Sequence, residues 1–216
     1  MSRRPREIKK NFKVFCEGDT EYHYIDEMRR QLRCSIALKP VNMKGGGYRN
    51  FLDNLRIDGN MNCLAKFIII DGDKAAGNEK EKKNLKELLE YCVLQNNSGR
   101  IPHILIVNFP DFEYIGCLHT PGYKGQNIKQ YLMKEMGYKD IESLKSDKKI
   151  YYVLNTNGNS SRLMLAALKR ENCFIENLCT VNKNRFEIKV NTVCDWEKFG
   201  RRGSNIHEYF AVLKCF

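Results

Sequence analysis

The sequence lacks several features that would assign it to a class at once. No apolar stretch approaches the roughly 20 residues of a membrane-spanning helix. It contains no internal repeat, no low-complexity tract and no P-loop. The basic N-terminus, Met1-Ser2-Arg3-Arg4-Pro5-Arg6, leads into an expected strand rather than into the apolar core of a signal peptide. These absences favour a soluble globular protein and argue against a membrane protein, a repeat array and a P-loop NTPase.

Paired cysteines and zinc-type spacings are also missing. The nine cysteines include no C-x-x-C, and several lie in apolar runs where reduced cysteine acts as a small hydrophobe. Cys117 and His119 are two residues apart, but no second Cys/His pair stands at zinc spacing. Unpaired cysteines fit a reducing compartment, so we expect a cytoplasmic protein without a zinc site.

Positive charge, in contrast, is abundant. The 216 residues contain 37 Lys+Arg and 26 Asp+Glu, which gives a net charge of +11. Such an excess favours a polyanionic partner, above all nucleic acid, although a basic surface that serves only solubility is the plain alternative. Charge does not separate DNA from RNA, and no membrane partner is expected.

Apolar runs and amphipathic segments alternate over residues 8–120, which predicts an α/β fold with a parallel or mixed sheet flanked by helices. We interpret residues 1–216 as one domain, in which 121–216 form a helical C-terminal extension on the same core. The expected strands cover residues 8–15, 35–41, 64–70 and 102–107. The expected helices cover residues 20–33, 49–55, 79–94, 112–119, 126–136, 160–169 and 205–213.

Two acidic clusters stand where expected strands end. Glu17 follows the first strand, and Asp71 and Asp73 follow the apolar run 67–70. In open α/β sheets, ligands collect outside the carboxyl ends of the strands, so these carboxylates should meet there. Close carboxylates repel one another without a cation, and Mg²⁺ or Mn²⁺ prefers oxygen ligands. The pattern therefore predicts a divalent metal site.

Asp71 and Asp73 would point the same way if the backbone is extended there, and Gly72 would let a phosphate approach. A plain Asp-Gly surface turn is the alternative. Glu21 would lie in the first turn of the next helix, where the helix dipole alone also explains a carboxylate. With only four histidines, a metal-bound water is the expected nucleophile rather than a water activated by histidine.

Several motifs resemble known families. The turn Cys16-Glu17-Gly18-Asp19-Thr20-Glu21, followed by an apolar strand and Asp71-Gly72-Asp73, resembles a Toprim domain, as in topoisomerases, bacterial primases and OLD-type nucleases. The stretch Asn108-Phe109-Pro110-Asp111-Phe112-Glu113-Tyr114, closing at Leu118-His119, resembles the S-N-P-x-F-E-x-W…H segment of RloB-like proteins. Gly203-Ser204-Asn205-Ile206-His207 is similar to that family's T-N-[VI] element. The chain departs from the family pattern in having a single residue, Asp19, between Gly18 and Thr20, and Tyr22 in place of a proline.

The resemblance to RloB-like proteins implies a Toprim-like fold and a Mg²⁺-dependent nuclease that cleaves DNA or RNA in prokaryotic defence against phage. It also implies a possible ABC- or AAA-type ATPase partner. By the same resemblance, Glu17 is a metal ligand or general acid/base, and Asp71 and Asp73 are metal ligands. Glu21 matches the second glutamate of OLD-like enzymes, and Glu113 lies at the rim of the metal site.

Basic residues near the expected site would neutralise phosphate. The expected contacts to nucleic acid are Lys44, Arg49, Lys74, His119, Lys124, Arg201 and Arg202. Lys44 and Arg49 flank Gly45-Gly46-Gly47, whose amides could wrap a phosphate. An ordinary glycine-rich connector is equally compatible with that segment, and a helix-capping role is the alternative for His119.

Two other functions fit the same residues. In one, the acidic site is catalytically inactive and the chain is a nucleic-acid-binding or nucleotide-binding regulatory subunit beside an ATPase. In the other, the chain catalyses primase-like nucleotidyl transfer, for which the absence of a P-loop offers no support.

Overall fold

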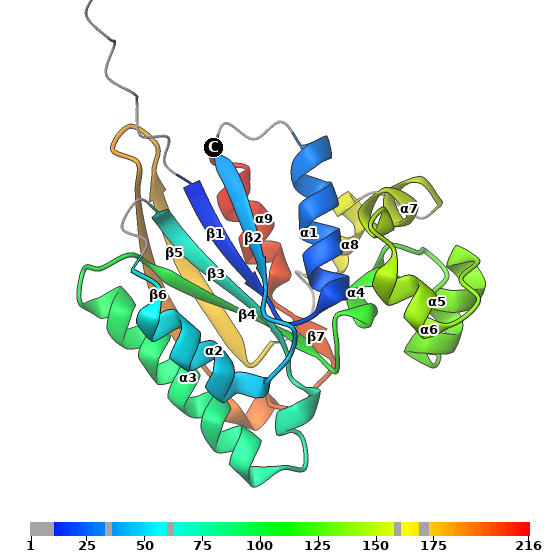
Figure 1. Cartoon of the computed structure of the whole chain (residues 1–216), viewed down its shortest axis with the longest axis horizontal. Helices are drawn as coiled ribbons and strands as arrows, with labels where there is room; N and C mark the ends of the chain where they lie inside the picture. Colours follow the sequence, from blue (N-terminus) through cyan, green and yellow to red (C-terminus); the bar gives the residue numbers. More distant parts are fainter. Residues whose placement is uncertain (1–10, 33–35, 60–62, 158–160, 169–172) are drawn as a thin grey trace, which may run out of the picture.

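The computed structural model describes residues 11–32, 36–59, 63–157, 161–168 and 173–216. Within them the chain forms an α/β fold on a five-stranded sheet with helices on both faces (Figure 1). The strand order is β2-β1-β3-β4-β7, in which the first four strands are parallel and β7 runs antiparallel to β4. The predicted fold class is confirmed. The strands of this sheet are β1 (Asn11–Cys16), β2 (Ala37–Asn42), β3 (Cys63–Asp71), β4 (His103–Phe109) and β7 (Gly203–Ser204).

The four parallel strands and their helices lie close to the ranges expected from the apolar pattern. The expected first residues of β1 and β2, at 8–10 and 35, fall outside the described residues, as do the outer ends of the helix expected over 160–169. The α-helices are α1 (Asp19–Gln31), α2 (Gly47–Ile57), α3 (Glu79–Asn97), α4 (Glu113–Leu118), α5 (Ile128–Met136), α6 (Ile141–Ser146), α7 (Ile150–Asn157), α8 (Ser161–Leu168) and α9 (Ile206–Leu213).

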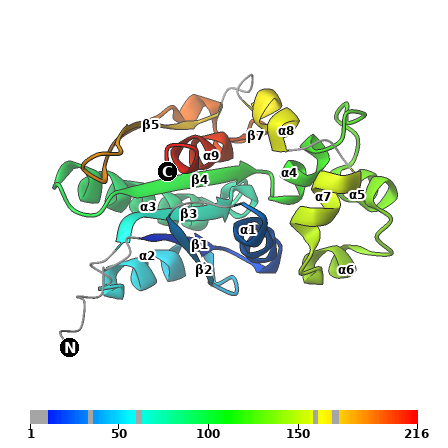
Figure 2. The same cartoon turned by 90° about the horizontal axis from the view of Figure 1, so that it is seen from above.

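The central strand β3 packs on both of its faces, which explains its continuous apolar sequence. Phe67 and Ile69 pack into a core shared with α1, α9 and the helices from α4 to α8. Ile68 and Ile70 face the other way and pack against α2 and α3. Figure 1 shows α2 and α3 on the opposite side of the strands from α1, and Figure 2, seen from above, shows α9 beside β4. The sheet interior is therefore apolar on both sides, and polar chemistry is left to the strand ends.

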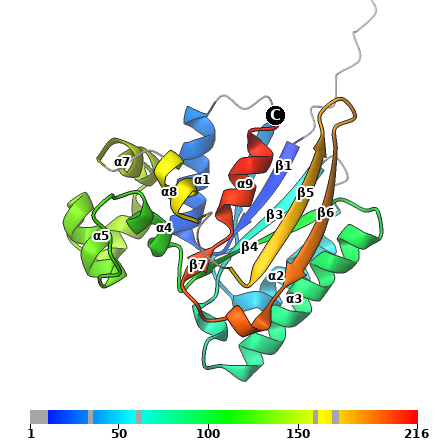
Figure 3. The same ribbon diagram turned by 180° about the vertical axis from the view of Figure 1, so that it is seen from behind.

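The C-terminal part differs from the expected helical extension. Its described residues include an antiparallel hairpin of β5 (Ile175–Asn182) and β6 (Glu187–Cys194). Buried and exposed side chains alternate along most of both strands, a period of two that is typical of a half-buried sheet. In Figure 3 the hairpin runs alongside α3 and α9.

A buried polar network attaches this hairpin to α9 and β4. Glu208 accepts hydrogen bonds from the backbone and side-chain nitrogens of Asn177, at 3.0 and 2.7 Å, and from Asn205 at 3.0 Å. Both asparagines also donate to the carbonyl of Leu105. Asn205 accepts from the amide of Val107 at 2.8 Å. The network thus provides hydrogen-bond partners for the backbone carbonyl of Leu105 and the amide of Val107, which precede the residues of β4 that pair with β7.

Across the described ranges, none of the helices has both the length and the apolar character needed to cross a membrane.

Candidate active site

Four buried or partly buried carboxylates gather near the carboxyl ends of β1 and β3. Glu17 directly follows β1, and Asp71 is the last residue of β3. Glu21 and Glu113 come from the first turns of α1 and α4. Glu17, Glu21 and Glu113 each expose less than a tenth of their surface. Consecutive parallel strands place their carboxyl ends at the same edge, so residues far apart in sequence meet here.

The charges of these carboxylates act on one another. Burial, together with the charges of Glu21, Glu17, Glu113 and Asp111, raises the pKa of Asp71 well above its usual range. Burial also raises the pKa of Glu21 to about 8; Glu113 and Glu17 add to the rise, while backbone hydrogen bonds oppose it. Excess negative charge in a poorly solvated place is therefore the main property of this site.

Glu17 connects β1 to the segment after β3. One of its carboxylate oxygens accepts the amide of Asp71 at 2.9 Å, and the other contacts the ammonium group of Lys74 at 2.5 Å. This bond raises the pKa of Lys74, although burial opposes the change. Lys74 was expected to contact nucleic acid, and the structure places its ammonium group on Glu17. Its positive charge balances part of the negative charge of the carboxylates.

Glu21 does more than begin a helix. Its carboxylate accepts the backbone amide of Gly18 at 3.2 Å, a helix-capping bond in the first turn of α1, where the helix dipole was the simpler explanation. Its side chain is nevertheless 3% exposed and interacts electrostatically with Asp71. Glu21 therefore both caps α1 and belongs to the buried acidic group, and its role as a metal ligand stays a prediction.

Glu113 joins α4 to α1, because its carboxylate accepts a hydrogen bond from the hydroxyl of Thr20 at 3.3 Å. Two residues earlier, Asp111 forms a further acid that the sequence interpretation missed. Burial and the charge of Glu113 raise its pKa to about 6, whereas Lys129 lowers it. Asp111 stands two residues before Glu113 in the same sequence motif, and this proximity could have identified it.

Asp73 lies apart from the buried carboxylates. It was expected to point the same way as Asp71, but the strand ends at Asp71 and a short 3-10 helix (η1, Asp73–Ala75) begins. Gly72 has helical dihedrals, φ −93° and ψ −9°, so the two-residue period of an extended strand is broken. Asp73 is exposed at the rim, where its charge still reaches Asp111.

A glycine stands at position 72 because a neighbouring ring leaves little space for a side chain, not because the turn is open to a ligand. A Cβ atom added to Gly72 would lie 2.6 Å from the ring of Phe109. The amide of Gly72 donates to the carbonyl of Asn108 at 2.7 Å, which closes the turn against β4. The space that we expected for a phosphate is therefore taken by Phe109, which follows Asn108 and precedes a cis bond to Pro110.

The glycine-rich loop packs over the first acidic turn. The amide of Gly45 donates to the carbonyl of Glu17 at 2.8 Å, and Lys44 is exposed on this loop. Arg49 instead lies in α2 and pairs with Asp53 and Glu87, each at 3.3 Å. Lys44 is accordingly available to an incoming ligand, whereas Arg49 already links α2 to α3.

A second basic group lies beside Asp111. Arg202 donates to the hydroxyl of Tyr123 at 3.0 Å and lies over the rings of Tyr114 and Tyr123. Together with Lys129, a residue that we did not anticipate, Arg202 and Asp111 line a cavity of about 420 Å³. Lys124 and Arg201 are exposed nearby in sequence. Cations and aromatic rings thus border the acidic group.

His119 has a different place from the one expected. It is completely buried, and its Nε2 lies 3.2 Å from the hydroxyl of Tyr24 in α1. A side chain without exposed surface cannot contact a nucleic-acid strand that binds at the protein surface. We therefore assign His119 to the packing of α4 against α1 instead of to nucleic acid.

The carboxylates are not arranged as a finished metal site. Over the described part of the chain, no three His, Cys, Asp or Glu residues are oriented to hold one ion. Glu17 is turned to Lys74 and to the amide of Asp71, and Glu113 is turned to Thr20. The oxygen donors suit a hard divalent cation, but their side chains would have to rotate to surround it.

Comparisons of the chain with protein-family models, with curated proteins and with solved structures each find no match.

Proposed function

We propose that this protein is a Mg²⁺- or Mn²⁺-dependent nuclease of the Toprim type that cleaves nucleic-acid phosphodiesters. The observation that carries the proposal is the burial of Glu17, Glu21 and Glu113 beside the half-buried Asp71; desolvation and mutual repulsion raise the pKa of Asp71 and Glu21. Charges that repel one another in the folded state are stabilised by a bound cation. A protein of net charge +11 attracts a polyanion to the same place.

The residues have separate roles in this proposal. Glu17, Glu21, Asp71 and Glu113 would hold the cation, with Asp73 at the exposed rim. A divalent cation there supplies Lewis-acid activation of the phosphate and of a water molecule. Lys44, Lys124, Arg201 and Arg202 bind the phosphate backbone, and Tyr123 offers a ring on which a base can stack.

The biological setting follows from the resemblance alone. RloB-like proteins imply anti-phage defence and an ABC- or AAA-type ATPase partner, and we extend the proposal to both. Co-purification of such an ATPase with this protein from its own host would support that part.

Incubation with single-stranded DNA, double-stranded DNA and tRNA tests the activity. We expect cleavage of at least one substrate in Mg²⁺ or Mn²⁺ and none in EDTA. Asp71→Asn and Glu17→Gln should each abolish cleavage, whereas Glu90→Gln, on the exposed face of α3, should not. Undiminished cleavage by both site variants would exclude the proposed role of the acidic group.

A regulatory, catalytically inactive module is the second candidate, and one observation favours it. Lys74 already neutralises Glu17, as a resident cation would in a site without a metal. This candidate predicts nucleic-acid binding that is insensitive to EDTA, with no product from any of the three substrates.

A further inference from the structure

A second concave region lies at the amino ends of β3 and β4, away from the acidic group. It is a cavity of about 570 Å³ between α2, α3 and the first residues of β4. That size is typical of small-molecule sites. Lys66 lines it, five residues before Asp71 on β3, so the two regions are about 16 Å apart along the strand.

The cavity is positively charged. Asp58 sits between Lys13 and Lys66, with ion-pair distances of 2.5 and 2.9 Å, so two lysines face one carboxylate. Lys66 is buried, which makes its charge unusual at this depth. Arg56 and Arg100 add two further positive charges to the lining; the partner of Arg56, Asp53 at 3.7 Å, lies outside that lining. The balance favours an anionic ligand.

His103 supplies a hydrogen-bond acceptor that no described residue satisfies. Its Nδ1 lies 2.7 Å from the carbonyl of Ile101, so Nδ1 carries the proton and donates. Its Nε2 is buried and has no partner among the described residues. Burial lowers the pKa of His103 to about 4, so the ring is neutral at pH 7. A ligand N–H or O–H group would satisfy this atom, which otherwise costs stability.

Flat and apolar groups complete the lining. The ring of Tyr91 packs edge-on against His103, with 5.5 Å between centroids, and Arg56 lies over the same tyrosine at 6.0 Å. The lining thus combines cations with an aromatic ring and an unsatisfied acceptor. An inorganic phosphate alone would match the cations and leave the ring without a partner.

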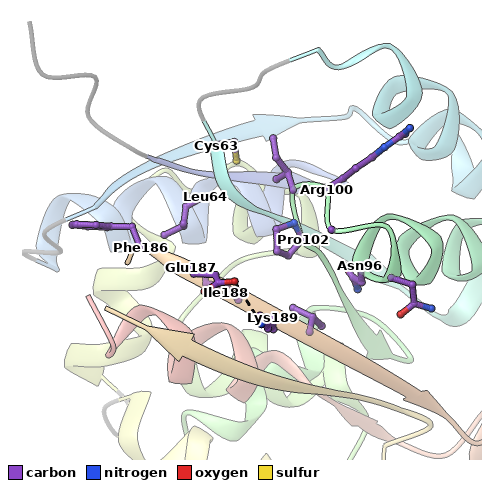
Figure 4. A pocket seen from close by; sticks show the side chains of 13 residues that line it. Cys63, Leu64, Asn96, Arg100, Pro102, Phe186, Glu187, Ile188 and Lys189 are labelled. Atoms are coloured by element: carbon purple, nitrogen blue, oxygen red, sulfur yellow. Dashed lines mark ion pairs between the residues drawn. The ribbon is translucent and has the colours of Figure 1, made fainter. Parts of the chain in front are cut away.

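A neighbouring cavity of about 700 Å³ is less suited to an anion. It lies on the other side of Arg100 and Ile101, between the start of β3 and the hairpin (Figure 4). Its Lys189 is paired with Glu187 at 3.7 Å. In Figure 4 the side chain of Arg100 extends away from Phe186 and Glu187. Arg100 is therefore available to the smaller cavity.

We propose that the cavity between α2 and α3 binds a nucleoside phosphate. Arg56 and Arg100 hold its phosphate, and an N–H or O–H group of its base or sugar donates to Nε2 of His103 beside Tyr91. The site does not depend on the proposed nuclease activity, because it shares no residue with the acidic group.

Calorimetric titration in EDTA, with the full chain, tests this site. The probes are AMP, GMP, UMP and ATP, with adenosine and inorganic phosphate as the separate halves of the ligand. We expect saturable binding of at least one nucleotide, at least tenfold tighter than that of inorganic phosphate. The double variant Arg56→Gln/Arg100→Gln should weaken it at least tenfold, and Lys80→Gln/Lys83→Gln, with the same charge change on exposed positions of α3, should not.

His103→Phe should weaken nucleotide binding while leaving the weak binding of phosphate unchanged. Absence of nucleotide binding to the unmodified protein, or equal binding to the double arginine variant, overturns the proposal. Equally tight binding of inorganic phosphate overturns the nucleoside part. Asp71→Asn should bind the nucleotide normally, and a loss there would place the ligand at the acidic group instead.

Discussion

The hydroxyl of Ser204 donates a 2.8 Å hydrogen bond to the side-chain carbonyl of Asn108, although 96 residues separate the two in the sequence. Both side chains are completely buried. The side-chain nitrogen of Asn108, Nδ2, lies 3.4 Å from the carboxylate of Asp71. The segment before α9 is thus connected through one asparagine to the acidic group, which is built by the first half of the chain.

Ser204→Ala should destabilise the protein by about 1–3 kcal/mol, because it leaves Asn108 without its donor and the amide of Ile206 without its acceptor. Urea unfolding measures the change. Ser146→Ala, which removes an exposed hydroxyl in α6, is the control and should change the free energy of unfolding by less than about 0.5 kcal/mol. Equal effects of the two substitutions would show that the hydrogen bonds of Ser204 add no more to the free energy of unfolding than those of an exposed serine.

The stability of the metal-free protein should fall as the pH rises from about 4.5 towards 8. The pKa of Glu21 is near 4.5 in the unfolded chain and about 8 in the fold, so the native state binds more protons in this window. Ionising a group that the fold keeps protonated costs free energy, and stability is therefore lost as the pH approaches 8. The raised pKa values of Asp111 and Glu208, about 6 and 7, add to the slope.

Glu21→Gln should flatten this slope and stabilise the metal-free protein at pH 8 by on the order of 2–4 kcal/mol. Thermal and urea unfolding across the pH range measure it, with Glu90→Gln as the exposed control. A Glu21→Gln protein that is less stable than the parent at pH 8 would contradict the assignment of repulsion to this group.

Lys74→Met should increase the stabilisation that Mg²⁺ or Mn²⁺ confers. The substitution removes the ammonium group from Glu17 and leaves one carboxylate oxygen available to a cation. We expect a lower melting temperature than the parent in EDTA and a larger upward shift when the cation is added. Lys82→Met, on α3, controls for the loss of a lysine. An unchanged shift would mean that Lys74 does not compete with a cation.

Arg202→Gln should weaken nucleic-acid binding several-fold and reduce the slope of log affinity against log salt by about 1. Arg202 lies with Tyr123 and Tyr114 beside Asp111, where a bound strand would reach the acidic group. Arg185→Gln, on the exposed hairpin turn, is the matched control. Equal losses in the two variants would indicate diffuse electrostatic binding without a defined path.

The parallel sheet was predictable because its signals are local. The apolar run 67–70 ends at Asp71, and Glu17 follows a similar run, so the meeting of these two residues follows from strand direction alone. The prediction that Asp71 and Asp73 point the same way was wrong. The backbone leaves the extended conformation at Gly72, whose helical dihedrals accompany the close approach of Phe109 from another strand.

The hairpin over residues 175–194 and the position of His119 show the same limit. β5 and β6 contain polar residues such as Asn177 that would suit a loop. Hydrogen bonds to Glu208, to the carbonyl of Leu105 and from Thr192 explain why Asn177 is buried. His119 has the local context of a helix end, yet Tyr24 from α1 determines its burial.

By itself the sequence determined the α/β alternation, the placement of acidic residues at strand ends and the excess of positive charge, because each depends on neighbours along the chain. The tertiary structure decided which oxygen of Glu17 contacts Lys74, which acids share one poorly solvated space, and which cations remain exposed. Those outcomes depend on contacts between residues tens of positions apart. Their energies arise from desolvation and Coulomb repulsion, which are set by separation in space rather than in sequence.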